Sequence, residues 1–188
     1  FPWDLLRRPW PGARYVAVSH DRRAQLAELL GLPERAIVVA PPGIDLAEFL
    51  KLEPATVALC ERLALLEAEP LLLLPARITR RKNIELAIRI VGALGRQGLR
   101  PRLVVTGPPG PHNPANAAYL AELQTICADE GATDAVVFLY EHQRDAQARP
   151  VPASDAQLAD LYRLADGLLF PSAYEGFGIP IIEAGLSG

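Results

Sequence analysis

The sequence predicts an α/β protein built on a parallel, doubly wound sheet. Short apolar runs typical of buried strands alternate with helical patterns over residues 71–188. The connections are short enough for right-handed crossovers. The run Leu71–Leu74 is apolar at every position, as expected of a strand buried on both faces of a parallel sheet. Half of the 188 residues are apolar and 22% are charged, which excludes a disordered chain.

The first part of the chain predicts a smaller strand–helix–strand unit. A β-rich run at 14–18 precedes a helical pattern at 21–30, for which Ser19 is a suitable cap. A second strand is expected at 37–40. The prolines after it cannot continue a ladder, so residues 41–55 are predicted to be a linker.

The larger part of the chain then alternates regularly. Helices are expected at 55–66, 83–94, 114–130, 154–165 and from 180 onward. Strands are expected at 71–74, 103–106, 135–139 and 167–170. Asn83 is predicted to cap its helix, and Ser154 and Gln157 have the spacing of a capping box.

Charge and cysteine usage narrow the class of protein. The net charge of −3 gives no argument for a nucleic-acid partner, and none is expected; membrane association stays open. Cys60 and Cys127 lie far apart in helical patterns, so we expect buried free thiols and a reducing, cytoplasmic location; the alternative is that the two cysteines pair outside the cell. The absence of methionine and the abrupt ends predict a piece of a longer chain.

The loop after the strand at 71–74 is strongly basic. Four cations occupy six positions from Arg77 to Lys82, directly ahead of a helix. A helix amino end offers unpaired N–H groups and partial positive charge, so this loop suits a phosphate or diphosphate. The alternative is a solvated basic turn.

A glycine, Gly107, follows the strand at 103–106 and would let a ligand approach the backbone. The surrounding loop is rich in proline and contains His112, features that also occur without a ligand.

The loop after the last strand carries two carboxylates eight positions apart, Glu175 and Glu183, around Gly176 and Gly178. A carboxylate accepts paired hydrogen bonds from neighbouring hydroxyls, so this segment suits a sugar or a ribose. The amides ahead of the helix could hold a hydroxyl or a phosphate. Glu183 has the alternative of a purely structural cap or pair.

At these residues the sequence resembles the retaining glycosyltransferases of the GT-B fold, in the large family 4. Their Glu-x7-Glu motif is matched by Glu175 and Glu183, and their Arg-x4-Lys pair is matched by Arg77 and Lys82. The two motifs stand in the family's order, separated by the expected number of strand–helix units.

The resemblance implies a Rossmann-like donor-binding domain at 46–188, truncated at its carboxyl end. Residues 1–45 would be the remnant of a second Rossmann-like domain, which binds the acceptor in this family, together with the crossing between the domains. The segment 39–45 resembles that crossing, with Pro42 where the family usually has asparagine. With the amino-terminal domain missing, we expect the fragment to bind a donor weakly and to transfer sugar poorly or not at all.

The resemblance also implies roles for residues. Arg77 and Lys82 would hold the donor diphosphate and stabilise the leaving group, Glu175 would contact the transferred sugar, and no metal or other cofactor is expected. Glu183 would bind the ribose. The other residues expected to line the donor pocket are Gly107, Val137, Leu139, Leu158, Gly176, Phe177 and Gly178.

The implied enzyme is a hexosyltransferase that moves a sugar from a nucleoside diphosphate to an acceptor hydroxyl with retention, by front-face displacement. Alternatives are a non-catalytic nucleotide-sugar-binding module and a related GT-B synthase or phosphorylase. A nicotinamide-dependent dehydrogenase is disfavoured because no strand is followed by Gly-x-Gly-x-x-Gly, and a Walker motif is also missing. The donor base, the sugar, the acceptor and the oligomeric state stay open.

Overall fold

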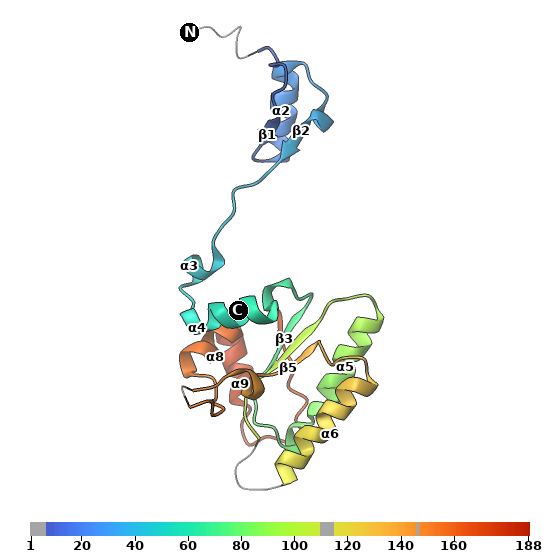
Figure 1. The fold of residues 1–188 in the computed structure, drawn as a ribbon, viewed down its shortest axis with the longest axis vertical. Helices are drawn as coiled ribbons and strands as arrows, with labels where there is room; N and C mark the ends of the chain where they lie inside the picture. The colour runs from blue at the N-terminus through green and yellow to red at the C-terminus, as the bar shows by residue number, and fades with distance from the viewer. Residues whose placement is uncertain (1–6, 110–114, 146) are drawn as a thin grey trace. The chain divides into compact units, whose positions relative to one another are not determined.

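The computed structural model describes residues 7–109, 115–145 and 147–188 (Figure 1). The chain divides into two compact units between Leu50 and Lys51. The domain boundary expected from the family resemblance, after residue 45, stays a prediction.

The first unit is a small strand–helix–strand motif. Its elements are β1 (Tyr15–Ala17), α2 (His20–Leu30), the 3₁₀ helix η1 (Glu34–Ala36), β2 (Ile37–Val39) and α3 (Leu46–Leu50). The strands β1 and β2 pair in parallel, with Tyr15 opposite Ile37. The predicted cap is confirmed, because the Ser19 hydroxyl accepts a hydrogen bond from the Arg22 N–H. The buried residues among those described in this unit are Ala17, Ala27, Leu30 and Ile37.

The predicted linker at 41–55 is partly wrong, since α3 lies inside it. Asp45 explains this helix, because its Oδ1 accepts a hydrogen bond of 3.0 Å from the Glu48 N–H, as a capping carboxylate does. The next helix begins at Pro54, a position in the first turn where the missing N–H of proline has no cost.

The second unit contains the predicted parallel sheet. Its strands are β3 (Leu71–Leu74), β4 (Arg102–Val105), β5 (Val136–Phe138) and β6 (Gly167–Leu168). Their spatial order is β5-β4-β3-β6, and every pair is parallel. Because β3 and β6 are neighbours, the loops that leave their carboxyl ends emerge side by side.

Helices cover both faces of this sheet. They are α4 (Pro54–Leu63), α5 (Ile84–Arg96), α6 (Ala115–Asp129), α7 (Leu139–His142), α8 (Asp155–Leu164) and α9 (Ile179–Ser187), with short 3₁₀ turns η2 (Leu65–Glu67) and η3 (Arg80–Lys82). In Figure 1, α5 and α6 lie on one side of the sheet and α4 and α8 on the other.

The core explains the apolar run in β3. Leu72 and Leu74 pack in the cluster with α5 and α6, whereas Leu71 and Leu73 pack with α4 and α8. Each buried leucine contributes about 1.5–3 kcal/mol relative to an exposed one. Because its side chains alternate between the two helical layers, β3 lies in the middle layer. The position of β3 in turn sets where the loop after it begins.

Some details of these elements differ from the prediction. β5 ends at Phe138 and the short helix α7 follows at once, where a strand end and a polar loop were expected. β6 has only two residues. The cap at Ser154 is confirmed, but the reciprocal bond of a capping box is absent, because Gln157 instead accepts a hydrogen bond from the Gln143 side chain.

Both cysteines are buried free thiols, as predicted. Burial raises the pKa of Cys127 to about 11 and also raises that of Cys60, so neither is a reactive thiolate. Within the described ranges, no helix is long and apolar enough to cross a membrane.

Candidate functional site

The basic loop 75–83 leaves the carboxyl end of β3 and turns through η3. Thr79 enters the turn in an extended conformation, and its carbonyl accepts a hydrogen bond of 2.9 Å from the Lys82 N–H. Asn83 leaves the turn in the left-handed region, with φ of 49°. This single turn directs Arg81 and Lys82 toward the loop with Glu175 and directs Arg80 away from it.

Lys82 and Glu175 meet at the centre of the site. The Lys82 ammonium, 9% exposed as a residue, donates to Oε1 of Glu175. The Arg81 guanidinium donates to Oε2 of the same carboxylate at 2.9 Å. Hydrogen bonds from Lys82 and then from Ser172 lower the pKa of Glu175 to about 2, so this carboxylate is ionised at neutral pH. Two of the predicted catalytic residues, 93 positions apart, are therefore in direct contact.

The loop that carries Glu175 is docked on the basic turn through its backbone. The Ala173 N–H donates to the carbonyl of Arg81 at 3.0 Å. The Asn83 side-chain amide donates to the carbonyl of Pro171 at 3.2 Å. Asn83 is the N-cap residue of α5, as predicted, but its side chain makes no capping hydrogen bond: the residue lies in the left-handed region, and its amide ties the two loops together instead.

Arg77 lies apart from this pair. Its side chain is exposed, between buried Ala76 and Ile78, and makes no hydrogen bond or ion pair with the described part of the chain. The structure therefore presents Arg77 to solvent near the start of the loop, where it is available to an anion.

Gly107 is explained by packing of the protein itself. Its N–H donates to the carbonyl of Ala76 at 3.1 Å. A Cβ at this position would lie 2.4 Å from that oxygen and 2.6 Å from the Cα of Arg77. The glycine lets the loops after β3 and β4 touch, and contact with a ligand at Gly107 stays a prediction. His112 lies outside the described residues.

Glu183 has a partner that the sequence did not indicate. The hydroxyl of buried Tyr162, on α8, donates to Oε2 of Glu183 at 2.7 Å. The residues just before α9 include Gly176 and Phe177, which are exposed, and Gly178, which adopts φ of 77° and so favours glycine.

Three residues predicted to line the donor pocket, Val137, Leu139 and Leu158, lie in or against the core. Val137 is 3% and Leu139 is 0% exposed, and Leu158 packs against the same cluster. Their side chains hold the sheet to α4 and α8, so only backbone atoms of Val137 and Leu139 could face a base. A role for these residues in donor binding stays a prediction.

The site can bind an anion and hydroxyl groups. Arg77, Arg81 and Lys82 supply cationic donors, and two ionisable carboxylates supply acceptors. Within residues 7–109, 115–145 and 147–188, no group of three or more His, Cys, Asp or Glu could hold a metal ion. Arg81 could have been recognised from the run of cations, whereas nothing local pointed to Tyr162.

Comparison with known proteins identifies the family of the chain. The model of the family "Glycosyl transferases group 1" matches residues 60–188. A D-inositol 3-phosphate glycosyltransferase of Kineococcus radiotolerans is 33% identical over 175 residues, which are 91% of this chain and 37% of that protein. One from Nocardia farcinica is 31% identical over 177 residues, 93% of this chain and 36% of that protein. The chain thus spans well under half the length of these relatives.

Solved structures share the fold at lower identity. A glycosyltransferase of Rickettsia africae has a TM-score of 0.53 at 22% identity, over 94% of this chain and 42% of that one. Anabaena HepE in complex with UDP-glucose has a TM-score of 0.55 at 19% identity, over 93% of this chain and 43% of that one. Since the family model covers more than half of the chain, the chain belongs to the group 1 glycosyl transferases.

Proposed function

We propose that this chain carries the donor site of a retaining glycosyltransferase, in which Arg77 and Lys82 hold the diphosphate of a nucleotide sugar. The observation that carries the proposal is the Lys82–Glu175 pair at the carboxyl edge of the sheet, with Arg81 as a second cation on the same carboxylate. Ligands bind at this edge in open parallel sheets.

A bound diphosphate would replace Glu175 as the ion-pair partner of Lys82. In the unliganded chain the ammonium and the carboxylate neutralise each other. A diphosphate carries more negative charge than one carboxylate, and Arg77 adds a solvent-facing cation to the same loop. Glu175 would keep Arg81 as its partner, so its charge would stay compensated. The cations then stabilise the negative charge that develops on the leaving diphosphate.

Glu183 is the residue that would bind the ribose hydroxyls of the donor. Tyr162 holds one of its oxygens at 2.7 Å and so orients the carboxylate. A fixed carboxylate suits paired hydroxyls, and the amides of residues 176–178, ahead of α9, suit hydroxyl or phosphate oxygens of the donor.

The reaction we propose is transfer of a hexose with retention, by front-face displacement and without a metal. Glu175, the acidic residue of the central pair, has a pKa near 2 and two cationic partners, which make it a weak nucleophile. A nucleotide-sugar donor is also supported by the HepE complex with UDP-glucose, a protein of the same fold. We propose that the acceptor site is supplied by an amino-terminal domain, since the chain covers only 37% of the Kineococcus relative.

Calorimetric titration of the chain with UDP, GDP, ADP and NAD tests this function. At least one nucleoside diphosphate should bind. Lys82→Ala should weaken it by about tenfold or more, as expected for a lost charge-assisted hydrogen bond, and Arg77→Ala should weaken it as well. Arg89→Ala is the matched control, since Arg89 is an exposed cation on α5, outside the loop. Binding of NAD alone, or equal binding by all variants, would contradict the proposal.

A further inference from the structure

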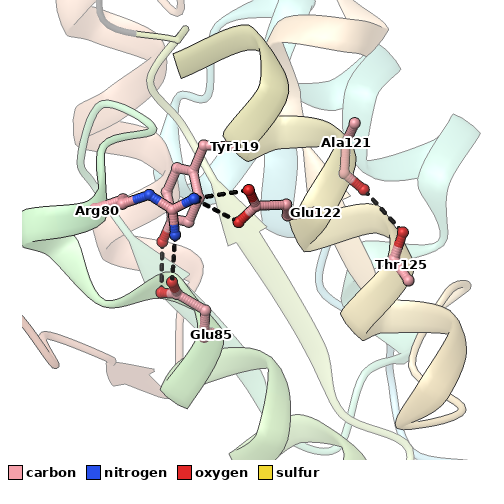
Figure 2. A network of polar contacts seen from close by, with 6 residues as sticks. All are labelled: Arg80, Glu85, Tyr119, Ala121, Glu122 and Thr125. Carbon is pink, nitrogen blue, oxygen red and sulfur yellow. Dashed lines mark hydrogen bonds and ion pairs between the residues drawn. The ribbon is translucent and has the colours of Figure 1, made fainter. Parts of the chain in front are cut away.

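Four side chains on the far side of η3 form a polar cluster that the proposed donor site does not use (Figure 2). One terminal nitrogen of Arg80 donates to both carboxylate oxygens of Glu122, at 2.6 and 2.7 Å, and the other lies 4.0 Å from Glu85. The guanidinium sits 4.8 Å from the ring centroid of Tyr119, whose hydroxyl donates to Glu85. Tyr119 is 1% exposed, so the ring beneath Arg80 is fixed by the core.

The cluster bridges three elements. Arg80 belongs to η3, Glu85 to the first turn of α5, and Tyr119 and Glu122 to α6. Successive residues of a 3₁₀ turn point about 120° apart. With Arg80 directed at α5 and α6, the next two residues, Arg81 and Lys82, are directed at the loop with Glu175, and their contacts show this.

The charge of the cluster argues against direct contact between Arg80 and a phosphate. One cation faces two carboxylates there, so the cluster is net negative and would repel a diphosphate. Arg80 can serve the site only through the backbone that it shares with Arg81 and Lys82.

We propose that Arg80 is a positioning residue of the donor site: by clamping η3 to α5 and α6, it holds Lys82 and Arg81 toward Glu175. The part of this inference that concerns the diphosphate rests on the proposed function. The part that concerns the Lys82–Glu175 pair does not, because the pair is formed by the chain's own side chains.

The test compares Arg80→Ala and Glu122→Gln with Arg96→Ala. Arg96, the last residue of α5, forms a 2.9 Å ion pair with Glu130, which directly follows α6. The side chain of Arg96 is 60% exposed and that of Arg80 is 62% exposed. Arg96 lies at the opposite end of α5 from the site, which makes it a matched control for loss of an exposed ion pair.

The first readout needs no ligand. Carboxyl ¹³C NMR of Glu175 should show a pKa far below the ordinary range in wild type and in Arg96→Ala. In Arg80→Ala and Glu122→Gln the pKa should rise toward its ordinary value. A variant that is only less stable, with η3 in its place, would keep the wild-type pKa of Glu175. An unchanged pKa in both Arg80→Ala and Glu122→Gln would therefore overturn the inference.

The second readout is the affinity for UDP, GDP or ADP, whichever binds best. Arg80→Ala and Glu122→Gln should each bind this nucleotide about two- to fivefold more weakly than wild type, which is the effect expected for the loss of an exposed but well-formed ion pair. Arg96→Ala should bind with the wild-type affinity. Tighter binding by Glu122→Gln would mean that Arg80 is itself a phosphate ligand, and would overturn the inference. If wild type binds no nucleoside diphosphate, the proposed function fails, while the pKa of Glu175 still decides whether Arg80 positions the pair. If Arg80→Ala does not fold, Glu122→Gln, which keeps the cation, carries both readouts.

Discussion

A single methyl group at Gly107 should disturb both the stability of the fold and the donor loop. In Gly107→Ala the new Cβ would lie 2.4 Å from the Ala76 oxygen and 2.6 Å from both the Ala76 carbonyl carbon and the Arg77 Cα. These are backbone atoms, which cannot rotate away as the end of a side chain can. One of the two loops must therefore move.

The size of the effect follows from two contributions. Overpacking by one methyl group costs about 1–3 kcal/mol, and the hydrogen bond from Gly107 to Ala76 is worth about 1 kcal/mol net. We expect a loss of about 2–4 kcal/mol, which is a large part of the stability of a typical domain. Urea unfolding should show a lower midpoint at an unchanged slope. Affinity for a nucleoside diphosphate should fall as well, because the Arg77 backbone is displaced.

Gly95→Ala is the control: it should raise the free energy of unfolding, whereas Gly107→Ala should lower it. An added Cβ there meets nothing within 4 Å, and Gly95 lies inside α5. Alanine should stabilise the helix by about 0.5–1 kcal/mol. If Gly107→Ala unfolds at the wild-type midpoint, the close approach of the two loops is wrong.

Three further predictions concern acidic side chains. In Tyr162→Phe, Glu183 loses the hydroxyl that orients it, so the preference for a nucleoside diphosphate over its 2′-deoxy analogue should shrink in calorimetry; an unchanged preference would argue against a ribose contact. The pKa of Glu175 falls from 4.5 to about 2, chiefly through Lys82, so the ion pair stabilises the fold above pH 4.5 and is lost as the pH drops toward 2. The difference in urea stability between wild type and Glu175→Gln should therefore shrink across that window, and a constant difference would refute the linkage. Asp160 is 1% exposed and accepts hydrogen bonds from the start of α4, so Asp160→Asn should cost about 2–4 kcal/mol in urea unfolding yet leave diphosphate affinity unchanged.

The sheet could be predicted because its signals are local. Four successive apolar residues at Leu71–Leu74 require burial on both faces, and the structure buries them alternately toward α5 and α4. The apolar stripe of α5 likewise identifies its core face, with Ile84, Ala87, Ile88 and Val91 all buried. Such patterns reflect the repeat of a strand or a helix and depend little on residues that are distant in sequence, so they can be recognised from the sequence alone.

The contacts of the site could be predicted only in part. The motif spacing named Lys82 and Glu175, but it did not indicate that they pair with each other or share Arg81. Tyr162 and Glu183 lie 21 positions apart on different helices, and their contact depends on how α8 and α9 pack. Short backbone features were also missed, because the left-handed conformation of Asn83 depends on the loop it bonds.

The most direct test of the account is to map the amide chemical shifts of the chain as it is titrated with the nucleoside diphosphate that binds. The account predicts that the largest changes fall in residues 75–83 and 175–183, at the carboxyl edge of the sheet. A cavity of about 510 Å³ at the amino end of β4, lined in part by Arg96, Arg102 and Glu130, is the competing location. Changes gathered around that cavity, with the two loops unperturbed, would contradict the assignment of the donor site.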